Sequence, residues 1–406
     1  MITRRHLLGT AGAGAALAIS GLPKFSESLA AGVGTSPGVP EGVNSIASMA
    51  SLPGKKPLIQ LSDRPPNYES PIEYFRTPIT PNDQFFVRYH LSDIPEIKAE
   101  NYKISVGGDG ANGQSELTLD DLKKMPAIEV VAVNQCSGNR RGLSKPHVAG
   151  VEWGYGAMGC ARWKGAKLKD VLDKVGLKKE AIEIAFNGAD GPAFDKTPDF
   201  IKSIPVWKAI DESTIIAYEM NGQPLPHFNG FPARIIVPGW TGTYWMKHVV
   251  SITALTKPQG GFWMNPAYRI PLGKFPLRDR FTSQEYAPNT PITEIVVNSL
   301  ITSHRDGAKV QAGKIAVSGM AWDGGYGIRM VEVSTDGGKT WGSAALGQDL
   351  GVYAFRPWSF DLTAKRGKNT MMVNAINKIG QAQTSELIFN PAGYHNNVMQ
   401  NITLMA

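Results

Sequence analysis

The sequence predicts an α+β protein that is mainly β and ends in a β-sandwich of immunoglobulin-like size. One observation is the composition, because 44 glycines and 28 prolines among 406 residues favour a chain rich in turns and strands. The other is a change of pattern near residue 291, after which short strand-like runs alternate with turns. We therefore expect two consecutive domains, residues 71–290 and 291–406.

Composition excludes several classes of protein. Apolar residues make up 42% and charged residues 19%, which excludes a disordered or fibrous chain. The sequence beyond the N-terminus holds no apolar run long enough for a spanning helix, so we expect no membrane span. Two cysteines, Cys136 and Cys160, exclude a disulfide framework, a Cys-rich zinc site and a Cys-x-x-Cys-His haem attachment motif. The net charge of +7, without a Lys/Arg-rich run, argues against nucleic acid and suits small anions or an acidic protein partner.

The N-terminus predicts export in the folded state. Arg4 and Arg5 precede a weakly apolar stretch rich in Gly and Ala, which is the pattern of a twin-arginine signal. We expect a signal peptide over residues 1–30, a mature chain of net charge +5 and a periplasmic location. Because this pathway carries folded proteins, often with a cofactor already inserted, the signal also hints at a cofactor.

The segment after the signal is expected to be an extended arm, residues 31–70, because its first half is rich in Gly, Ser, Ala and Pro. Residues 85–90 form a short strand-like run, and residues 117–125 predict a capped helix stopped by a proline. Residues 128–133 predict a buried strand that leads directly into the segment around Cys136.

Two further segments of the first domain have clear patterns. Apolar residues at 168, 171, 172 and 175 lie on one face of a helix, and Gly176 is a suitable residue to end it. Residues 235–239 predict a strand that enters a loop rich in Gly and Trp. In the second domain we expect strands at residues 314–322, 327–334, 358–362 and 369–376. Asp336-Gly337-Gly338 predicts a hairpin turn, and Asp323-Gly324-Gly325 predicts another turn.

Cys136 lies in the most informative segment. It follows the predicted strand, and Arg140 and Arg141 stand four and five residues later, so their positive charge would favour the thiolate. A thiolate is a good ligand for soft or high-valent metals. Gly138 would let the backbone turn close to whatever the cysteine binds. An inert buried cysteine with surface arginines is the alternative.

Three other segments favour the functional interpretation. Residues 88–90 place Arg88 and His90 on one face of a strand end. Residues 227–234 place a histidine and an arginine around a Gly-Phe-Pro turn, and residues 239–248 form a loop dense in polar donors and aromatic rings. Together these groups describe a site for anions beside a metal thiolate.

The motifs resemble one known family. Cys-Ser-Gly-Asn-Arg-Arg from residue 136, Phe-Val-Arg-Tyr-His from 86, Asn-Gly-Phe-Pro-Ala-Arg from 229 and Trp-Met-Lys from 245 are similar to the sulfite oxidase family of molybdenum enzymes. The likeness is greatest to the bacterial periplasmic sulfite dehydrogenases. The run Val-Glu-Val-Ser-Thr-Asp-Gly-Gly-Lys-Thr-Trp from residue 331 resembles the immunoglobulin-like dimerisation domain of this family. The resemblance implies a sulfite-oxidase-type molybdopterin domain followed by this β-sandwich.

The resemblance also implies roles for single residues. Cys136 would be the only protein ligand of molybdenum, with one molybdopterin supplying the other sulfurs. The catalytic pocket for the substrate oxyanion would be lined by Arg88, His90, Arg141 and Tyr268, with Trp153 in its wall. Arg234 and Lys247 match residues that hold the molybdopterin phosphate and pterin.

Several positions depart from the family pattern or match nothing in it. Asn229 stands where animal members have a phosphate-binding histidine, and nearby His227 is the candidate replacement. The pocket arginine that the family draws from its C-terminal domain has no identified counterpart here. We expect Cys160 to be structural. No role is assigned to His147, His248, His304 and His395.

The implied activity is the oxidation of sulfite to sulfate, with the electrons passed to a c-type cytochrome and no haem in this chain. The implied assembly is a homodimer or a heterodimer with a cytochrome subunit. Two alternatives act on other sulfur compounds, as a sulfane dehydrogenase subunit or a sulfoxide reductase. Another alternative, of a different class, is an exported binding module without catalysis.

Overall fold

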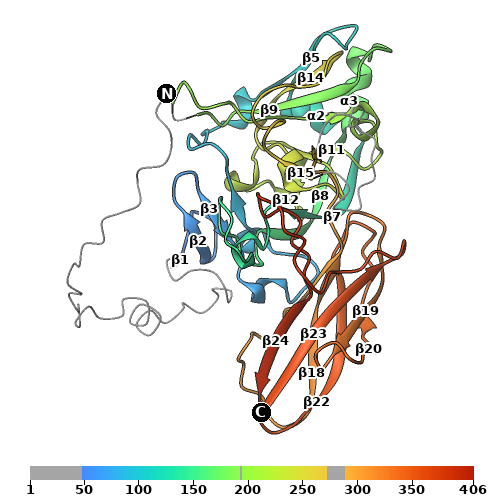
Figure 1. Ribbon diagram of the computed structural model, residues 1–406. Coiled ribbons are helices and arrows are strands. Elements are labelled where there is room, and N and C mark those ends of the chain that lie inside the picture. The colour runs from blue at the N-terminus through green and yellow to red at the C-terminus, as the bar shows by residue number, and fades with distance from the viewer. Residues whose placement is uncertain (1–47, 193, 272–288) are drawn as a thin grey trace, which may run out of the picture. The chain divides into compact units, whose positions relative to one another are not determined.

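The structure is a computed structural model that describes residues 48–192, 194–271 and 289–406 (Figure 1). These residues belong to one compact unit, residues 36–406. The described strands form six sheets with short helices between them, which confirms an α+β fold that is mainly β. The predicted signal peptide, and the predicted arm up to residue 47, lie outside the described residues. Within the described ranges, the helices are all too short or too polar to cross a membrane.

The first sheet corrects the predicted arm for residues 48–70. It has four antiparallel strands in sequence order. They are β1 (Ser48–Ala50), β2 (Leu58–Ser62), β3 (Asn67–Glu69) and β4 (Val87–Arg88). The strands bury a small cluster that includes Leu58, Tyr68 and Tyr89. Residues 48–70 are therefore paired in a sheet and are not a loose arm, because their large apolar residues pack in this cluster.

Two five-stranded sheets follow. The first has the order β10-β9-β14-β5-β6, in which only β14 and β5 are parallel. The second has the order β12-β11-β8-β7, with β13 paired to β11, and is antiparallel. The strands of the first are β5 (Lys103–Gly107), β6 (Ser115–Thr118), β9 (Glu183–Gly188), β10 (Ile201–Pro205) and β14 (Val249–Leu255). Those of the second are β7 (Ala127–Gln135), β8 (Met158–Lys167), β11 (Ile215–Met220), β12 (Gln223–Pro224) and β13 (Arg234–Ile236).

The helices are short. The α-helices are α2 (Leu119–Lys124), α3 (Leu168–Val175) and α4 (Val206–Ala209). Both predicted helices are confirmed: the Thr118 hydroxyl caps α2, and all four apolar residues of α3 are buried. Gly176 ends α3 at a φ of +65°, a conformation that glycine adopts without a steric cost. The 3₁₀ helices are η1 (Ile72–Phe75), η2 (Asn82–Gln84), η3 (Ala99–Asn101), η4 (Arg141–Leu143), η5 (His227–Asn229) and η6 (Gly242–Tyr244).

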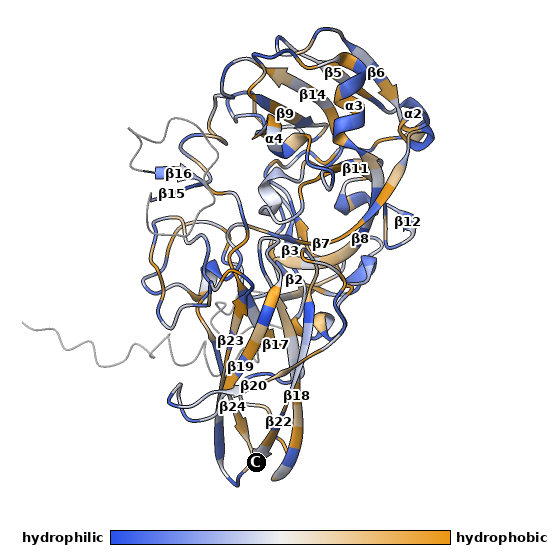
Figure 2. Ribbon diagram, turned by 90° about the vertical axis from the view of Figure 1, so that its right-hand side faces the viewer, coloured by the Kyte–Doolittle hydropathy of each residue, from blue (hydrophilic) through white to orange (hydrophobic). Residues whose placement is uncertain are grey.

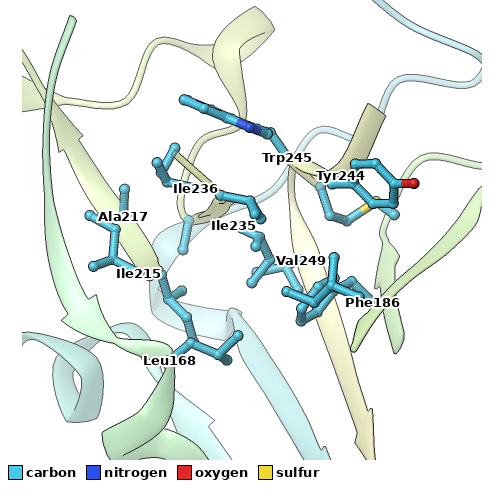
Figure 3. Packing of buried hydrophobic residues seen from close by; sticks show 14 of the residues in the cluster. Leu168, Phe186, Ile215, Ala217, Ile235, Ile236, Tyr244, Trp245 and Val249 are labelled. Carbon is cyan, nitrogen blue, oxygen red and sulfur yellow. The ribbon is translucent and has the colours of Figure 1, made fainter. Parts of the chain in front are cut away.

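The core of this region forms between the two five-stranded sheets. Figure 3 shows Ile215 of β11, Ile235 of β13 and Val249 of β14 directed toward one another. Phe186 of β9 and Leu168 of α3 complete the contact, and all five side chains are fully buried. Since burying a side chain of this size stabilises the fold by roughly 1.5–3 kcal/mol, the cluster holds the segments that lead to the pocket described below.

The C-terminal region is a β-sandwich of two four-stranded sheets, visible in orange and red in Figure 1. One sheet has the order β17-β18-β22-β21 and the other β20-β19-β23-β24. The strands are β17 (Asn298–Ile301), β18 (Gly313–Trp322), β19 (Ile328–Ser334), β20 (Gly342–Ser343), β21 (Ala345–Leu346), β22 (Arg356–Ala364), β23 (Lys368–Asn377) and β24 (Gln400–Met405). A small two-stranded sheet of β15 (Arg269–Pro271) and β16 (Asn289–Pro291) precedes it. The four predicted strands correspond to β18, β19, β22 and β23.

Alternation of side chains builds the sandwich core. Val317, Val331 and Val373 come from three strands of the two sheets and are fully or almost fully buried. Figure 2 shows hydrophobic and hydrophilic stretches along the strands of this sandwich, and residues 361–364 of β22 alternate between exposed and buried, as expected when one face of a strand is buried. The predicted hairpin turn at residues 336–338 joins β19 to β20, with Gly337 and Gly338 at positive φ.

Candidate functional site

A pocket with about 650 Å³ of space free of protein atoms lies beside the end of β7. Its lining comes from segments that are far apart in the sequence: the end of β4, the turn after β7, and the segments around β10 and after β13. Seven of the nine predicted site residues line it: Arg88, His90, Cys136, Asn229, Arg234, Lys247 and Tyr268. Arg141 and His227 are absent from the lining.

Cys136 is placed by the strand that precedes it. β7 pairs with β8 along its whole length, and the N–H of Cys136 continues the pairing by donating to the Ala157 oxygen at 2.9 Å. The cysteine is 8% exposed and lines the pocket. Gly138 permits a close approach as predicted, although the approaching group is Arg141: a Cβ at Gly138 would lie 2.6 Å from the guanidinium carbon.

The two arginines after Cys136 go to different places, which corrects the expectation that both would act on the thiol. The backbone of Arg140 is left-handed, with a φ of +69°. Its guanidinium is buried and donates to the backbone oxygens of Val398 at 2.7 Å and Ser299 at 2.8 Å, both in the C-terminal region. Arg141 instead lies against Gly138, next to the pocket lining. Adjacent positions therefore serve different parts of the molecule.

Arg88 lines the pocket and has one donor without a partner among the described residues. Its Nη1 donates to the Asn67 side-chain oxygen at 3.3 Å and to the backbone oxygen of Tyr89. Its Nε is buried and has no hydrogen-bond partner among the described residues. A guanidinium that is held by one nitrogen and open at another can bind an oxyanion with little loss of side-chain entropy.

His90 and Tyr268 form a hydrogen-bonded pair in the pocket wall. The His90 Nε2 contacts the Tyr268 hydroxyl, and the imidazole stacks on Phe200 with ring centroids 3.6 Å apart. Burial first, and then the charges of Arg88 and Lys202, hold the pKa of His90 well below its usual range. Burial raises the pKa of Tyr268. The pair is therefore a neutral imidazole and a neutral phenol at neutral pH.

The side chains of Arg234 and Lys247 line the other end of the pocket. Arg234 is buried, donates to the backbone oxygens of Asn229 and Trp245 at 2.9 Å each, and keeps its Nε without a partner among the described residues. Burial lowers its pKa to about 9. The ammonium of Lys247 donates to the Phe228 oxygen at 3.3 Å. Burial, followed by the charge of Arg234, lowers the pKa of Lys247 far below its usual value.

The amide of Asn229 is already engaged by the protein. Its Nδ2 donates to the Phe86 oxygen at 3.2 Å, and its Oδ1 accepts from the buried ammonium of Lys55. Burial lowers the pKa of Lys55 to about 7. His227 packs against Phe228 outside the lining, with ring centroids 5.0 Å apart. Asn229 is therefore held by Phe86 and Lys55, and His227, the candidate replacement for the family's histidine, lies outside the lining.

Two further predicted residues lie in the core. Trp153 is fully buried behind the pocket lining, where its ring meets Phe86 edge to face at 6.5 Å. Cys160 is also fully buried, in a cluster with Phe75 and Trp322. Burial raises the pKa of Cys160 to about 12, so this thiol stays protonated and unreactive.

The residues fit an anionic cofactor with a soft metal ion. Buried polar atoms of five residues at the pocket have no hydrogen-bond partner among those described: Arg88 Nε, Asn134 Oδ1, Ser137 Oγ, Arg234 Nε and Thr243 Oγ1. Such groups are costly unless a bound group satisfies them. The described residues contain no cluster of three or more His, Cys, Asp or Glu side chains suited to a metal. A metal ion here would thus depend on Cys136 and on ligands from its cofactor.

Several pocket residues were missed from the sequence. Asn134 and Ser137 flank Cys136, and Thr243 lies in the polar loop already singled out, so a signal for these existed. Asp190 stands in a segment without any motif, and so does Lys55, which lies outside the lining and donates to Asn229. Asp190 lines the pocket, and burial raises its pKa to about 6 against the opposing charge of Lys247.

Comparisons with known proteins agree with this geometry. Residues 90–263 match the oxidoreductase molybdopterin binding domain, and residues 289–406 match the Mo-co oxidoreductase dimerisation domain. The mitochondrial sulfite oxidase of Rattus norvegicus is 38% identical over 72% of this chain and 54% of its own length. The sulfite oxidase of Gallus gallus is 34% identical over 80% of this chain and 72% of its own.

One solved structure shares the fold over almost the whole chain. The sulfane dehydrogenase SoxCD from Paracoccus pantotrophus matches with a TM-score of 0.73 and 23% identity, over 97% of this chain and 94% of that one. The chain spans only about half the length of the rat enzyme. Sequence likeness over most of the chain, together with the molybdopterin-binding domain, shows that the chain belongs to the sulfite oxidase family of molybdenum oxidoreductases.

Proposed function

We propose that this protein oxidises sulfite to sulfate at a molybdenum centre held by Cys136. The observation that carries the proposal is the pocket, in which this thiol lies with the open donor of Arg88 and the His90–Tyr268 pair, next to a basic end that fits an anionic cofactor. The names of the relatives, which are sulfite oxidases, point to the same substrate.

In this proposal Arg88 binds the substrate. Its Nη1 is held by Asn67 and Tyr89, so its Nε is directed by the protein before sulfite arrives. A charge-assisted hydrogen bond from a preorganised guanidinium to a sulfite oxygen stabilises bound oxyanion by roughly 1.5–3 kcal/mol. Arg141, next to the lining, adds a second positive charge near the same place.

Protons are handled by His90 and Tyr268. Sulfite and one water give sulfate, two protons and two electrons, so the site must pass protons to solvent. When bound, the molybdenum cofactor supplies the two-electron oxidation and the transfer of the oxygen atom. The lowered pKa of His90 makes it a weak base, so in this proposal it passes a released proton on only transiently, through its hydrogen bond with the Tyr268 hydroxyl.

We further propose that the protein works in the periplasm and passes single electrons to a c-type cytochrome. The twin-arginine pattern at Arg4 and Arg5 supports export, and the resemblance to periplasmic sulfite dehydrogenases supports a cytochrome as the electron acceptor. The match to a dimerisation domain supports a homodimer, or a heterodimer with the cytochrome.

The decisive experiment is a metal analysis and a substrate panel on protein purified from the periplasm. We expect about one molybdenum per chain and reduction of ferricytochrome c by sulfite. Thiosulfate and a protein-bound persulfide test the sulfane dehydrogenase alternative, and a sulfoxide with a reduced dye tests the reductase alternative. Protein without molybdenum would favour a binding module, and a preference for a panel substrate other than sulfite would replace the proposed substrate.

A further inference from the structure

The segment between β23 and β24 carries a loop that is locked by its own side chains. The Asn390 Nδ2 donates to the backbone oxygen of Tyr394 at 2.8 Å, and its Oδ1 accepts from the Tyr394 N–H at 3.0 Å. The Gly393 N–H donates to the Asn390 oxygen at 3.0 Å. Asn390 is 3% and Tyr394 8% exposed, so the loop is an ordered, buried part of the protein.

This loop is joined to the turn that follows Cys136. The Nε of Arg141 donates to the Ala392 oxygen at 2.7 Å, and the amide of Asn396 donates to the Arg140 oxygen at 3.1 Å. Gly393 packs so closely on the stem of Arg141 that a Cβ there would lie 2.8 Å from its Cγ. A loop of the C-terminal region therefore holds the backbone and one side chain of the turn beside the pocket.

The ring of Tyr394 contacts two predicted substrate-binding residues at once. It stacks on the ring of Tyr268, with centroids 5.6 Å apart and an angle of 18° between the planes. The guanidinium carbon of Arg141 lies 5.2 Å from its centroid. Burial raises the pKa of Tyr394, against the charge of Arg141 and a hydrogen bond from the backbone of Tyr268.

Tyr268 needs such support because its backbone is left-handed, with a φ of +59°. This conformation costs a residue other than glycine roughly 1–2 kcal/mol, so the ring would leave its place if nothing held it. Aromatic stacking contributes about 0.5–1.5 kcal/mol, which is comparable to this strain, and the contact with Arg141 in turn holds the ring of Tyr394.

We propose that Tyr394 is a positioning residue for the oxyanion pocket: it holds the ring of Tyr268, which lines the pocket, and the guanidinium of Arg141, which lies next to the lining. The loop between β23 and β24 would then contribute to the affinity of the pocket for its anion, in addition to any role of the C-terminal region in forming a dimer. The identity of the anion rests on the proposed function, whereas the contacts of Tyr394 do not.

The test replaces the ring in the molybdenum-loaded full chain. We expect Tyr394→Leu to raise KM for sulfite about tenfold and to weaken sulfate binding, measured by calorimetry, by a similar factor, while kcat changes less than about threefold. Tyr394→Phe keeps the stacking and is expected to restore both values to within about threefold of wild type. Molybdenum content is measured for every variant and is expected to stay unchanged.

Tyr102→Leu is the matched control, because Tyr102 is equally buried, donates its hydroxyl to the Val249 oxygen, and lies outside the pocket lining. It should lower the melting temperature without changing KM or sulfate affinity. Wild-type KM and sulfate affinity in Tyr394→Leu overturn the inference. If that variant does not fold, Asn390→Asp loosens the same loop, and wild-type values there overturn it equally.

Failure of the proposed function can be told apart from failure of the positioning role, because activity and sulfate binding are measured separately. A wild-type protein that does not oxidise sulfite removes the proposed substrate, yet sulfate affinity still reports on the pocket. Weaker sulfate binding in Tyr394→Leu then supports the positioning role on its own.

Discussion

The pocket and the polar network around Gln383 in the C-terminal region both bury hydrogen-bonding side chains, but at the pocket several of them lack a partner among the described residues. Gln383 is 5% exposed, and its Oε1 accepts from the Ser299 hydroxyl and from the Ala375 N–H. Its Nε2 donates to the Asn298 side-chain oxygen at 3.2 Å. At the pocket, by contrast, buried donors such as Arg88 Nε and the Ser137 hydroxyl have no partner among the described residues.

This difference distinguishes buried polar side chains that stabilise the fold from those that bind a ligand. A satisfied network stabilises one arrangement of strands, so its loss should show in the free energy of unfolding. Unsatisfied donors around a cavity cost stability and are retained where a ligand pairs with them. Changes in the pocket should therefore alter binding and turnover, and changes in the network should alter stability. The following predictions test this division, from the largest expected effect to the smallest.

The largest effect on turnover is expected from the loss of the Cys136 thiol. Cys136→Ser should lower sulfite oxidation by more than about a thousandfold, or about 4 kcal/mol of barrier, because the hard hydroxyl replaces the thiolate ligand. Cys160→Ala is the control, since this thiol lies in the core: it should lower the melting temperature and leave kcat unchanged. Turnover at the wild-type rate by Cys136→Ser would show that the thiol is not the metal ligand.

The network should respond most in stability. Gln383→Leu leaves the Ser299 hydroxyl, the Ala375 N–H and the Asn298 oxygen without this partner, so we expect a loss of about 3 kcal/mol in the free energy of unfolding. Ser137→Ala removes a hydroxyl that no described residue binds and should change the stability of the cofactor-free protein by less than about 0.5 kcal/mol. The free energy of unfolding of both variants is measured with a denaturant. An equal loss of stability in Gln383→Leu and Ser137→Ala would contradict the difference between the network and the pocket.

Substrate affinity should depend on Arg88. Arg88→Met is expected to raise KM for sulfite about 10- to 100-fold, since it removes a charge-assisted hydrogen bond, with little effect on molybdenum content. Steady-state kinetics and metal analysis measure the two quantities separately. Arg162→Met, which removes an exposed arginine paired with Glu129, should leave KM unchanged. An equal KM for Arg88→Met and wild type would remove Arg88 from the substrate site.

The smallest effect is a dependence of stability on pH. Burial lowers the pKa of Lys202 to about 7, so between pH 7 and about 10 the unfolded chain binds a proton there that the folded chain does not. Stability contributed by this residue must therefore rise with pH in this window, by about 1 kcal/mol per pH unit. Wild type should thus gain stability relative to Lys202→Met from pH 7 to 9. The exposed Lys103→Met serves as the control, and parallel curves for wild type and Lys202→Met would contradict the prediction.

Much of the local structure could be predicted from the sequence. The four apolar residues of α3 and the long apolar run of β7 follow patterns that depend only on near neighbours, and the structure confirms both. The strands at residues 48–69 could not be predicted in this way, because strands of three to five residues are too short to show a periodic signal. Their order comes from packing against β4, which follows later in the chain.

The site was predicted in part. Motifs around Cys136, Arg88 and Arg234 marked these residues, and the pocket brings them together. Lys55 and Asp190 stand in no motif, because their part in the site depends on burial next to Asn229 and Lys247. The roles assigned to the lining residues stay predictions until the experiments above are done.

By itself, the sequence determined the family, the strand that ends at Cys136 and three basic residues that line one pocket, Arg88, Arg234 and Lys247. Only the tertiary structure decided that Arg140 serves the C-terminal region while Arg141 lies by the pocket, and that Tyr394 packs on Tyr268 from 126 residues away. The physical reason is that periodicity and motifs record interactions between neighbours in the chain. Desolvation, unsatisfied donors and ring stacking arise only when distant segments are packed together.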